Sequence, residues 1–250
     1  MLTHPTLDQL RALQLSGMLK ALTEQLQSSE CEHLSFLERF ALLVDREVAE
    51  RDNRRLTTRL RAAKLKQVAS LEDLDFHTPR QLDRGLIRTL APCGWVKDHL
   101  NILICGPTGV GKSFLACALA QKACREGYKA LYHRLPRLLA ELEIARGDGR
   151  YPTLMRPLAR VEVLVLDDWG FDSLTERQRR DLLEIFDDRY GIKSTIVTSQ
   201  LPVEHWHEAI GTPTLADAIL DRLVHNAYRI NLQGPSLRKH KALTDPALTQ

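Results

Sequence analysis

The chain has 250 residues, of which 44% are hydrophobic and 27% charged, and its formal net charge is +3. This is an ordinary globular composition, which argues against disordered and low-complexity scaffolds. No apolar run approaches the roughly 18 residues of a membrane-spanning helix, the first residues do not form a signal peptide, and no cysteines form a C-x-x-C pair. We therefore expect a reduced, cytoplasmic protein with no membrane partner.

The first 66 residues are predicted to form a small all-helical N-terminal domain that binds DNA or a partner. Leucines recur near helical spacing up to Leu26, with a candidate break at Ser16-Gly17. Ser35 and Glu38 have the spacing of a capping box, which places a helix start at Ser35. Beyond Val48 the apolar stripe fades and arginines replace it.

A second domain is assigned to residues 67–250, where short apolar runs alternate with helical patterns. Strands are predicted at 100–105, 129–133, 161–166 and 194–198. Helices are predicted at 113–126 and 137–145, and a third helix is predicted to open at a capping box from Ser173 to Glu176 and to run to about residue 190. This alternation predicts an α/β fold, a parallel sheet with helices on both sides.

The strongest motif is a glycine-rich loop that fits G-x-x-x-x-G-K-S, namely Gly106-Pro107-Thr108-Gly109-Val110-Gly111-Lys112-Ser113, followed by Phe114. It lies between a predicted strand and a predicted helix, as a phosphate-binding loop requires. Glycines let backbone N–H groups turn toward phosphate oxygens, and the helix start adds partial positive charge. Lys112 is expected to reach the β- and γ-phosphates, and Ser113 to bind Mg²⁺.

Two adjacent carboxylates, Asp167 and Asp168, end a buried strand and supply the second half of such a site. Asp167 is expected to hold the magnesium through Ser113 or water, and Asp168 to orient or deprotonate the attacking water. A polar residue at the end of the strand at 194–198 could touch the γ-phosphate or this water. Gln200 is the first choice and Thr198 the alternative.

Five motifs together carry a family resemblance: Gly-Pro-Thr-Gly-Val-Gly-Lys-Ser113, Leu-Asp-Asp-Trp-Gly170, Thr-Ser-Gln-Leu-Pro202, Ile-Leu-Asp-Arg-Leu223 and Ser-Leu-Arg238. With them, residues from about 70 to 240 resemble the IstB helper ATPases of bacterial insertion sequences. These are AAA+ proteins of the group that includes the DnaC helicase loader. The Asp-Asp-Trp-Gly and Thr-Ser-Gln-Leu-Pro segments favour IstB over helicase loaders, which more often carry Asp-Glu.

The resemblance implies an AAA+ ATPase that uses ATP and Mg²⁺, binds DNA, assembles into homo-oligomers on it, and recruits or stimulates a partner transposase. It places Asp168 where the family usually has Glu, and Gln200 at the first-sensor position, where Asn is more usual. It also implies that Arg222 is a finger arginine that reaches a neighbouring subunit's nucleotide, with Arg229 as an alternative, and that Arg238 is the second sensor. Each of these arginines, considered without the family, is only a basic residue.

Local basic density gives an independent reason to expect double-stranded DNA as a partner. Residues 51–66 hold seven basic side chains and one acidic one. Lys and Arg bind phosphates without sequence preference, and no helix-turn-helix or zinc-finger pattern is present, so largely nonspecific binding is expected. The candidate DNA contacts are Arg51, Arg54, Arg55, Arg59, Arg61, Lys64, Arg146 and Arg150. A solvated helix face would show the same charge pattern.

Three other functions use the same phosphate loop. A helicase loader similar to DnaC would grip a protein with its N-terminal region, and a small-molecule kinase would need an acceptor pocket. A nucleotide-gated interaction protein would hydrolyse ATP hardly at all. Stimulation of turnover by DNA or by a phosphate acceptor, and the choice of protein partner, distinguish these functions.

Overall fold

The computed structural model describes residues 5–27, 31, 33–170 and 173–237. The chain separates into two compact units, a helical unit up to Thr58 and a sheet unit from Arg59 onward. This division falls inside a helix, ahead of the boundary at residue 66 that the sequence suggests. Among the described residues, no helix is both long and apolar enough to span a bilayer.

The helical unit contains α1 (Pro5–Ala12), α2 (Ser16–Gln27) and the first part of α3 (Phe36–Ala63). The two short helices are separated at residues 13–15, just before the candidate break at Ser16-Gly17, and these two residues form the start of α2. The Glu38 N–H donates a 3.4 Å hydrogen bond to Ser35 Oγ, and the Ser35 N–H donates a 2.8 Å bond to the Glu38 carboxylate. This reciprocal pair is the expected capping box at the start of α3.

Glu47 of α3 joins α2 to α3. Its buried carboxylate accepts hydrogen bonds from the N–H groups of Gly17 and Met18, at 2.7 and 3.1 Å. These groups lie in the first turn of α2, where a helix has no acceptor of its own, so Glu47 caps α2. A Cβ at position 17 would lie 2.6 Å from the Cα of Glu47, which only glycine avoids.

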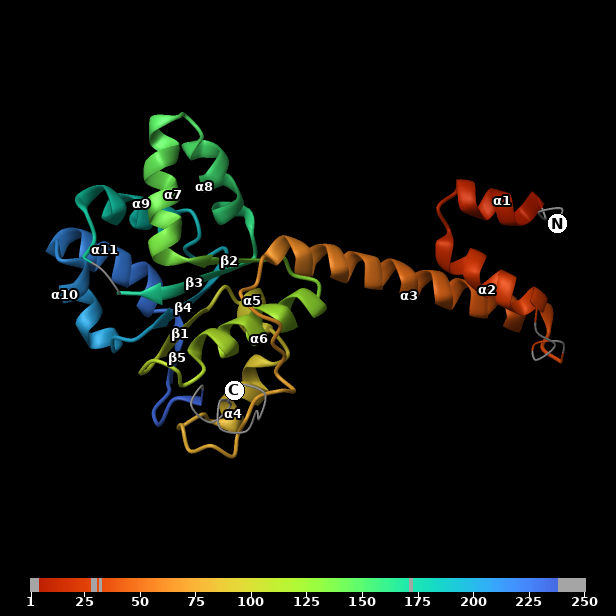
Figure 1. Ribbon diagram of the computed structural model, residues 1–250, viewed down its shortest axis with the longest axis horizontal. Coiled ribbons are helices and arrows are strands. Elements are labelled where there is room, and N and C mark those ends of the chain that lie inside the picture. The colour runs from red at the N-terminus through yellow and green to blue at the C-terminus, as the bar shows by residue number, and fades with distance from the viewer. Residues whose placement is uncertain (1–4, 28–30, 32, 171–172, 238–250) are drawn as a thin grey trace, which may run out of the picture. The chain divides into compact units, whose positions relative to one another are not determined.

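The sheet unit is built on five parallel strands in the order β2-β3-β4-β1-β5 (Figure 1). They are β1 (Asn101–Cys105), β2 (Ala130–Arg134), β3 (Val163–Trp169), β4 (Ser194–Ser199) and β5 (Ala227–Asn231). Every residue of β1 and β4 is buried, as expected for strands covered on both faces. Because β4 lies between β1 and β3, the carboxyl ends of these three strands meet at one edge of the sheet.

Helices cover both faces of the sheet, as the alternation predicts. On one face, α6 (Lys112–Arg125) contacts β1, β2, β3 and β4. The other face packs in one apolar core with α7 (Leu135–Gly147), α8 (Tyr151–Arg160), α9 (Glu176–Asp187), α10 (Trp206–Ile210) and α11 (Pro213–Val224) (Figure 1). The short helices α4 (Arg84–Leu90) and α5 (Gly94–Lys97) precede β1, and a 3₁₀ turn, η2 (Val203–His205), precedes α10.

The start of α9 and the presence of α8 differ from the sequence prediction. The cap of α9 is Thr175 instead of Ser173: Thr175 pairs reciprocally with Gln178, at 3.3 and 3.0 Å. The capping pattern occurs twice, offset by two residues, so spacing alone does not decide between the two starts. Helix α8 was not predicted because it contains Pro157, which removes a helical hydrogen bond.

Arg189, just after α9, binds the segments at the amino ends of β3 and β4. It was not identified as a structural residue from the sequence. It is 2% exposed, and it donates to the carbonyls of Leu158 and Val161 at 2.6 and 2.9 Å, to Thr195 Oγ1 at 3.0 Å, and to the carbonyl of Ser194. Its guanidinium therefore satisfies acceptors from several segments that water does not reach.

We expect Arg189→Met to lower the free energy of unfolding of the sheet unit by about 3–5 kcal/mol, because several buried acceptors lose their donor. Urea denaturation followed by circular dichroism measures this change. Arg156→Met is the matched control, since Arg156 is exposed on α8, and its expected change is within about 0.5 kcal/mol. Equal stability of the two variants would contradict a structural role for Arg189.

Candidate active site

The loop between β1 and α6 has the geometry of a phosphate cradle. Helix α6 begins at Lys112 with Gly111 as its N-cap, and glycine has no side chain to bond the first-turn N–H groups. The Lys112 ammonium lies over the loop and donates to the carbonyls of Gly106 and Pro107, at 2.7 and 2.9 Å. Helix N–H groups and an ammonium therefore converge where phosphate oxygens would bind.

Two segments that are distant in sequence form hydrogen bonds with the backbone of this loop. Arg80 is 3% exposed and donates to the carbonyls of Val110 at 3.1 Å and Asp75 at 2.7 Å. The Leu237 N–H donates to the carbonyl of Gly109 at 2.9 Å. Arg238, the expected second sensor, is the next residue along the chain and lies outside the described residues.

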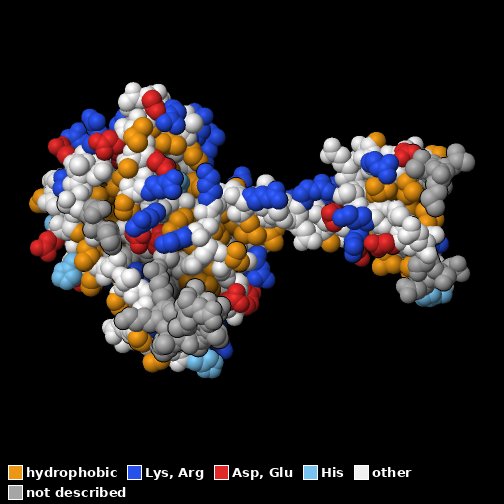
Figure 2. Space-filling model, in the orientation of Figure 1, with side chains coloured by type: hydrophobic (Ala, Val, Ile, Leu, Met, Phe, Trp, Pro, Cys, Tyr) orange, Lys and Arg blue, Asp and Glu red, His pale blue; other side chains and the backbone are white. Residues whose placement is uncertain are grey.

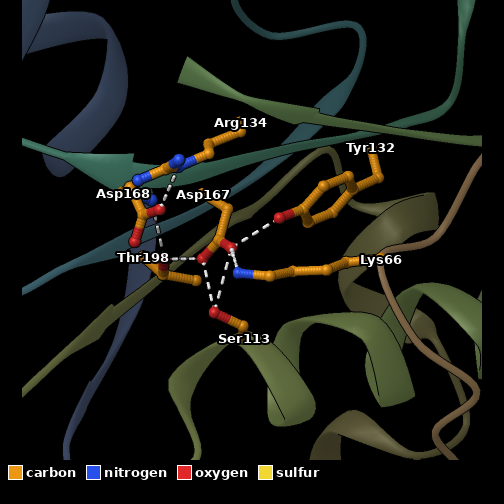
Figure 3. A network of polar contacts seen from close by, with 7 residues as sticks. All are labelled: Lys66, Ser113, Tyr132, Arg134, Asp167, Asp168 and Thr198. Carbon is orange, nitrogen blue, oxygen red and sulfur yellow. Dashed lines mark hydrogen bonds and ion pairs between the residues drawn. The ribbon is translucent and has the colours of Figure 1, made fainter. Parts of the chain in front are cut away.

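The carboxylate of Asp167 is the centre of a polar network at the carboxyl end of β3 (Figure 3). It is fully buried and accepts hydrogen bonds from Ser113 Oγ at 2.8 and 2.9 Å, from Tyr132 Oη at 2.5 Å and from Thr198 Oγ1. The Lys66 ammonium also lies 3.0 Å from its Oδ2. The predicted proximity of Ser113 and Asp167 is therefore present in the structure.

These partners keep Asp167 ionised. Burial raises the pKa of a carboxyl group, but hydrogen bonds from Thr198, Tyr132, Lys66 and Ser113 outweigh it and hold the pKa of Asp167 below its ordinary value. Burial, together with the hydrogen bond to Asp167, raises the pKa of Tyr132, which therefore stays a neutral donor. A charged oxygen ligand is thus held in a dry position beside the phosphate loop.

The carboxylate of Asp168 has a different partner from that of Asp167. Its φ is +66°, in the left-handed region, and the pairing of β3 with β4 shifts register between Leu166 and Trp169. Its carboxylate accepts a 2.7 Å bond from Arg134 Nε (Figure 3). A bulge of this kind changes the direction of the side chains that follow it. Here it lets the two consecutive carboxylates bind different partners.

Thr198 and Gln200 are the two residues that the sequence suggests as a sensor of the γ-phosphate or the attacking water. Thr198 is fully buried and contacts both acids, since it donates to Asp167 and accepts from the Asp168 N–H at 3.2 Å. Gln200 is exposed beyond the end of β4, and its Oε1 accepts a 2.8 Å bond from Thr108 Oγ1 of the phosphate loop. Gln200 thus touches the loop, whereas Thr198 touches the acids.

Sequence reasoning missed Lys66, Tyr132 and Arg134 as parts of this site. Tyr132 and Arg134 lie on β2, which pairs with β3 so that Arg134 stands opposite Asp167. The strand at 129–133 is predictable, but its position beside β3 is not. Lys66 was counted only as one charge of a basic stretch.

Arg222 lies at the opposite edge of the sheet from the phosphate loop. Asn101, the first residue of β1, donates to the carbonyls of Arg222 and Leu223 at 3.3 and 3.1 Å, whereas the loop follows Cys105 at the other end of β1. The Arg222 guanidinium pairs with Asp187 and donates to the carbonyl of Ala218 at 2.8 Å. It therefore does not contact the phosphate loop of its own chain.

The candidate DNA contacts divide by their environment. Several hold intramolecular partners: Arg51 pairs with Glu47, Arg54 with Ser16, Arg59 with the carbonyl of Cys124, Arg146 with Asp181, and Arg150 with Asp148. Arg146 lies in the last turn of α7 over the ring of Tyr151. Arg55 is exposed on α3 and pairs with Asp52 at 3.5 Å, and Arg61 and Lys64 are exposed at the end of α3 or just beyond it.

Solved structures with the same fold include replication proteins. A crystal structure of DnaI aligns with a TM-score of 0.55 at 24% identity, covering 66% of this chain and 90% of that one. A crystal structure of the DnaC helicase loader aligns with a TM-score of 0.52 at 20% identity, covering 63% and 93%. The sheet unit therefore has an AAA+ fold of the kind found in DnaI and DnaC.

Relatives of known sequence cover the whole chain. An insertion sequence ATP-binding protein of Sinorhizobium fredii, y4pL, is 56% identical over 241 residues, which are 96% of this chain and 98% of the relative. A second one from the same organism, y4uH, is 49% identical over 250 residues and the full length of both. The family model of IstB-like ATP-binding proteins matches residues 8–244. The chain therefore belongs to the IstB-like family of insertion-sequence ATP-binding proteins.

Proposed function

We propose that this protein is an ATP-hydrolysing transposition helper that binds duplex DNA largely without sequence preference, assembles into homo-oligomers on it, and recruits or stimulates a partner transposase. The observation that carries the proposal is the buried Asp167 carboxylate bonded to Ser113 beside the phosphate loop, in a chain of insertion-sequence ATP-binding type. Such an arrangement supports ATP binding and hydrolysis, and membership of the family supports a role in the movement of insertion sequences.

The donor set suits Mg²⁺. This ion prefers hard oxygen ligands, and the Ser113 hydroxyl and the ionised Asp167 carboxylate supply them at the first turn of α6. Held by these two residues, the ion would neutralise phosphate charge. Lys112 would bind the β- and γ-phosphates, and Gln200 or Thr198 would sense the γ-phosphate. Asp168 would polarise the attacking water after leaving its ion pair with Arg134.

The position of Arg222 at the far edge of the sheet supports assembly. An arginine that stabilises the transferred phosphate must reach it, and in this chain only a neighbouring copy could bring Arg222 to the nucleotide. A homo-oligomer in which one subunit's amino edge faces another's phosphate loop would meet that need. Arg238 is proposed as the second sensor because the chain just before it is bonded to the loop.

The DNA contact is proposed for the basic side chains along α3 and just beyond it. Figure 2 shows Lys and Arg side chains along this helix. Arg55, Arg61 and Lys64 are exposed there, and phosphate contacts of this type carry no sequence information. Their weight in binding can be measured through the salt dependence of affinity.

We expect the triple variant Arg55→Gln, Arg61→Gln and Lys64→Gln to bind duplex DNA more weakly for all sequences and to lose most DNA stimulation of phosphate release. The slope of log affinity against log salt should flatten by up to about three, at roughly 0.9 per lost phosphate contact. Fluorescence anisotropy over a salt series and a phosphate-release assay measure these effects.

The matched control removes three exposed charges from other helices: Arg88→Gln, Lys97→Gln and Arg177→Gln. Its slope should stay within experimental error of the wild type. An unchanged slope in the first triple variant would show that these α3 charges form a solvated surface and do not contact DNA phosphates. Turnover that does not respond to DNA in the wild type would contradict the proposed function itself.

A helicase loader is the second candidate, because DnaC and DnaI share the fold of the sheet unit. Purified protein would then retain a replicative helicase in a pull-down with ATP and fail to retain the transposase encoded by the same element. Retention of the transposase alone supports the transposition helper.

A further inference from the structure

Lys66 places a second cation on the carboxylate that is expected to bind magnesium. Its Nζ lies 3.0 Å from Asp167 Oδ2, the oxygen that also accepts from Tyr132 at 2.5 Å and from Ser113 at 2.9 Å (Figure 3). Asp167 is fully buried, whereas the Lys66 side chain is 39% exposed. The ammonium thus approaches the buried carboxylate from the solvent side.

The approach of Lys66 is built into the fold of its segment. Lys64 has a φ of +50°, which ends α3 and turns the chain, and Ala63 and Ala69 are buried on either side. Arg59 Nε anchors the end of α3 by donating to the carbonyl of Cys124 at 2.8 Å. The two ends of residues 64–69 are therefore held on the sheet unit, with Lys66 between them.

The chemistry of the site makes the two cations competitors. Without a metal ion, the buried Asp167 charge needs a counter-charge, and Lys66 supplies it. Mg²⁺ that arrives with ATP needs the same carboxylate and the Ser113 hydroxyl, and two cations beside one carboxylate oxygen repel each other. A flexible lysine whose side chain is partly in water can withdraw at little cost, whereas Asp167 cannot move.

We propose that Lys66 is a placeholder for magnesium, holding Asp167 in the nucleotide-free protein and being displaced when Mg²⁺ binds with ATP. The displacement removes one of the contacts that hold residues 64–69 on the sheet unit, so their backbone amides open to solvent more often. This inference rests on Mg²⁺ and ATP binding at Ser113 and Asp167, as proposed above.

The first test compares Lys66→Met with the wild type in a titration of Mg²⁺ at fixed concentration of fluorescent ATP analogue, starting from chelated solution. If the paired state holds nine-tenths of the nucleotide-free protein, removing it raises apparent Mg²⁺ affinity about tenfold. Affinity for the analogue without Mg²⁺ should change far less. Lys129→Met removes an exposed lysine of the same unit and should change neither quantity.

Two results of this titration overturn the proposal. Unchanged or weaker Mg²⁺ affinity in a folded Lys66→Met protein would show that Lys66 does not compete with the ion. Weaker binding of the analogue without Mg²⁺, with no gain in Mg²⁺ affinity, would make Lys66 a phosphate ligand. If Lys112→Ala binds the analogue as well as the wild type does, the nucleotide site itself is misassigned, which is a separate failure.

A second measurement needs no variant and covers the case in which Lys66→Met does not fold. Hydrogen exchange of residues 64–69 is followed in the wild type without nucleotide, with a non-hydrolysable ATP analogue in chelator, and with the same analogue plus Mg²⁺. Exchange should accelerate only in the third condition, by several-fold. Equal or slower exchange in that condition contradicts displacement of Lys66.

Discussion

Lys112→Ala is expected to lower the affinity for ATP about 100-fold, because the β- and γ-phosphates lose an ammonium that makes about two charge-assisted hydrogen bonds. Lys112 bonds the loop carbonyls of Gly106 and Pro107, so its side chain lies over the expected phosphate position. Equilibrium binding of a fluorescent ATP analogue measures the loss, and DNA-dependent assembly should fail with it.

The control for this variant is Lys129→Ala, which removes one exposed lysine from the same unit and should leave affinity unchanged. Circular dichroism and thermal unfolding establish that both variants keep the fold. Wild-type nucleotide affinity in a folded Lys112→Ala protein would remove the loop from the binding site, whatever the sequence motif suggests.

Arg222→Ala is expected to bind ATP normally and to lower turnover about 1,000-fold, the effect of a missing finger arginine. Mixing it with Asp168→Asn should restore part of the activity. In some interfaces of the mixture an intact Asp168 from one subunit faces an intact Arg222 from its neighbour. An arginine that acted within its own chain could not be rescued, because no subunit of the mixture holds both groups.

The structure supplies a matched control for this experiment. Asp187→Asn removes the carboxylate partner of Arg222 but keeps the arginine, so it separates loss of a surface ion pair from loss of the finger. Its turnover should stay near that of the wild type. No recovery at any mixing ratio, with both mutants shown to co-assemble, would count against Arg222 and turn attention to Arg229 on β5.

Features specified by neighbouring residues could be predicted from the sequence. The phosphate loop, the strand that ends in Asp167 and Asp168, the capping box at Ser35 and the parallel α/β fold all follow from periodicity and short-range spacing. Each is local because backbone hydrogen bonding and glycine conformation act within a few residues. The two candidate starts of α9, at Ser173 and Thr175, mark the limit of this information.

Strand order and long-range contacts decided the rest of the site. The position of β2 beside β3 brought Tyr132 and Arg134 to the two acids, and a bulge at the end of β3 aimed those acids at different partners. Lys66 reached Asp167 because α3 ends on the sheet unit, and Arg222 was placed at the far edge by the direction of β1. None of these contacts has a signal in local spacing, since each joins segments whose separation in the chain is set only by how the sheet is assembled. The sequence by itself identified the candidate phosphate and metal groups, and the tertiary structure decided which side chains neutralise, orient or oppose them.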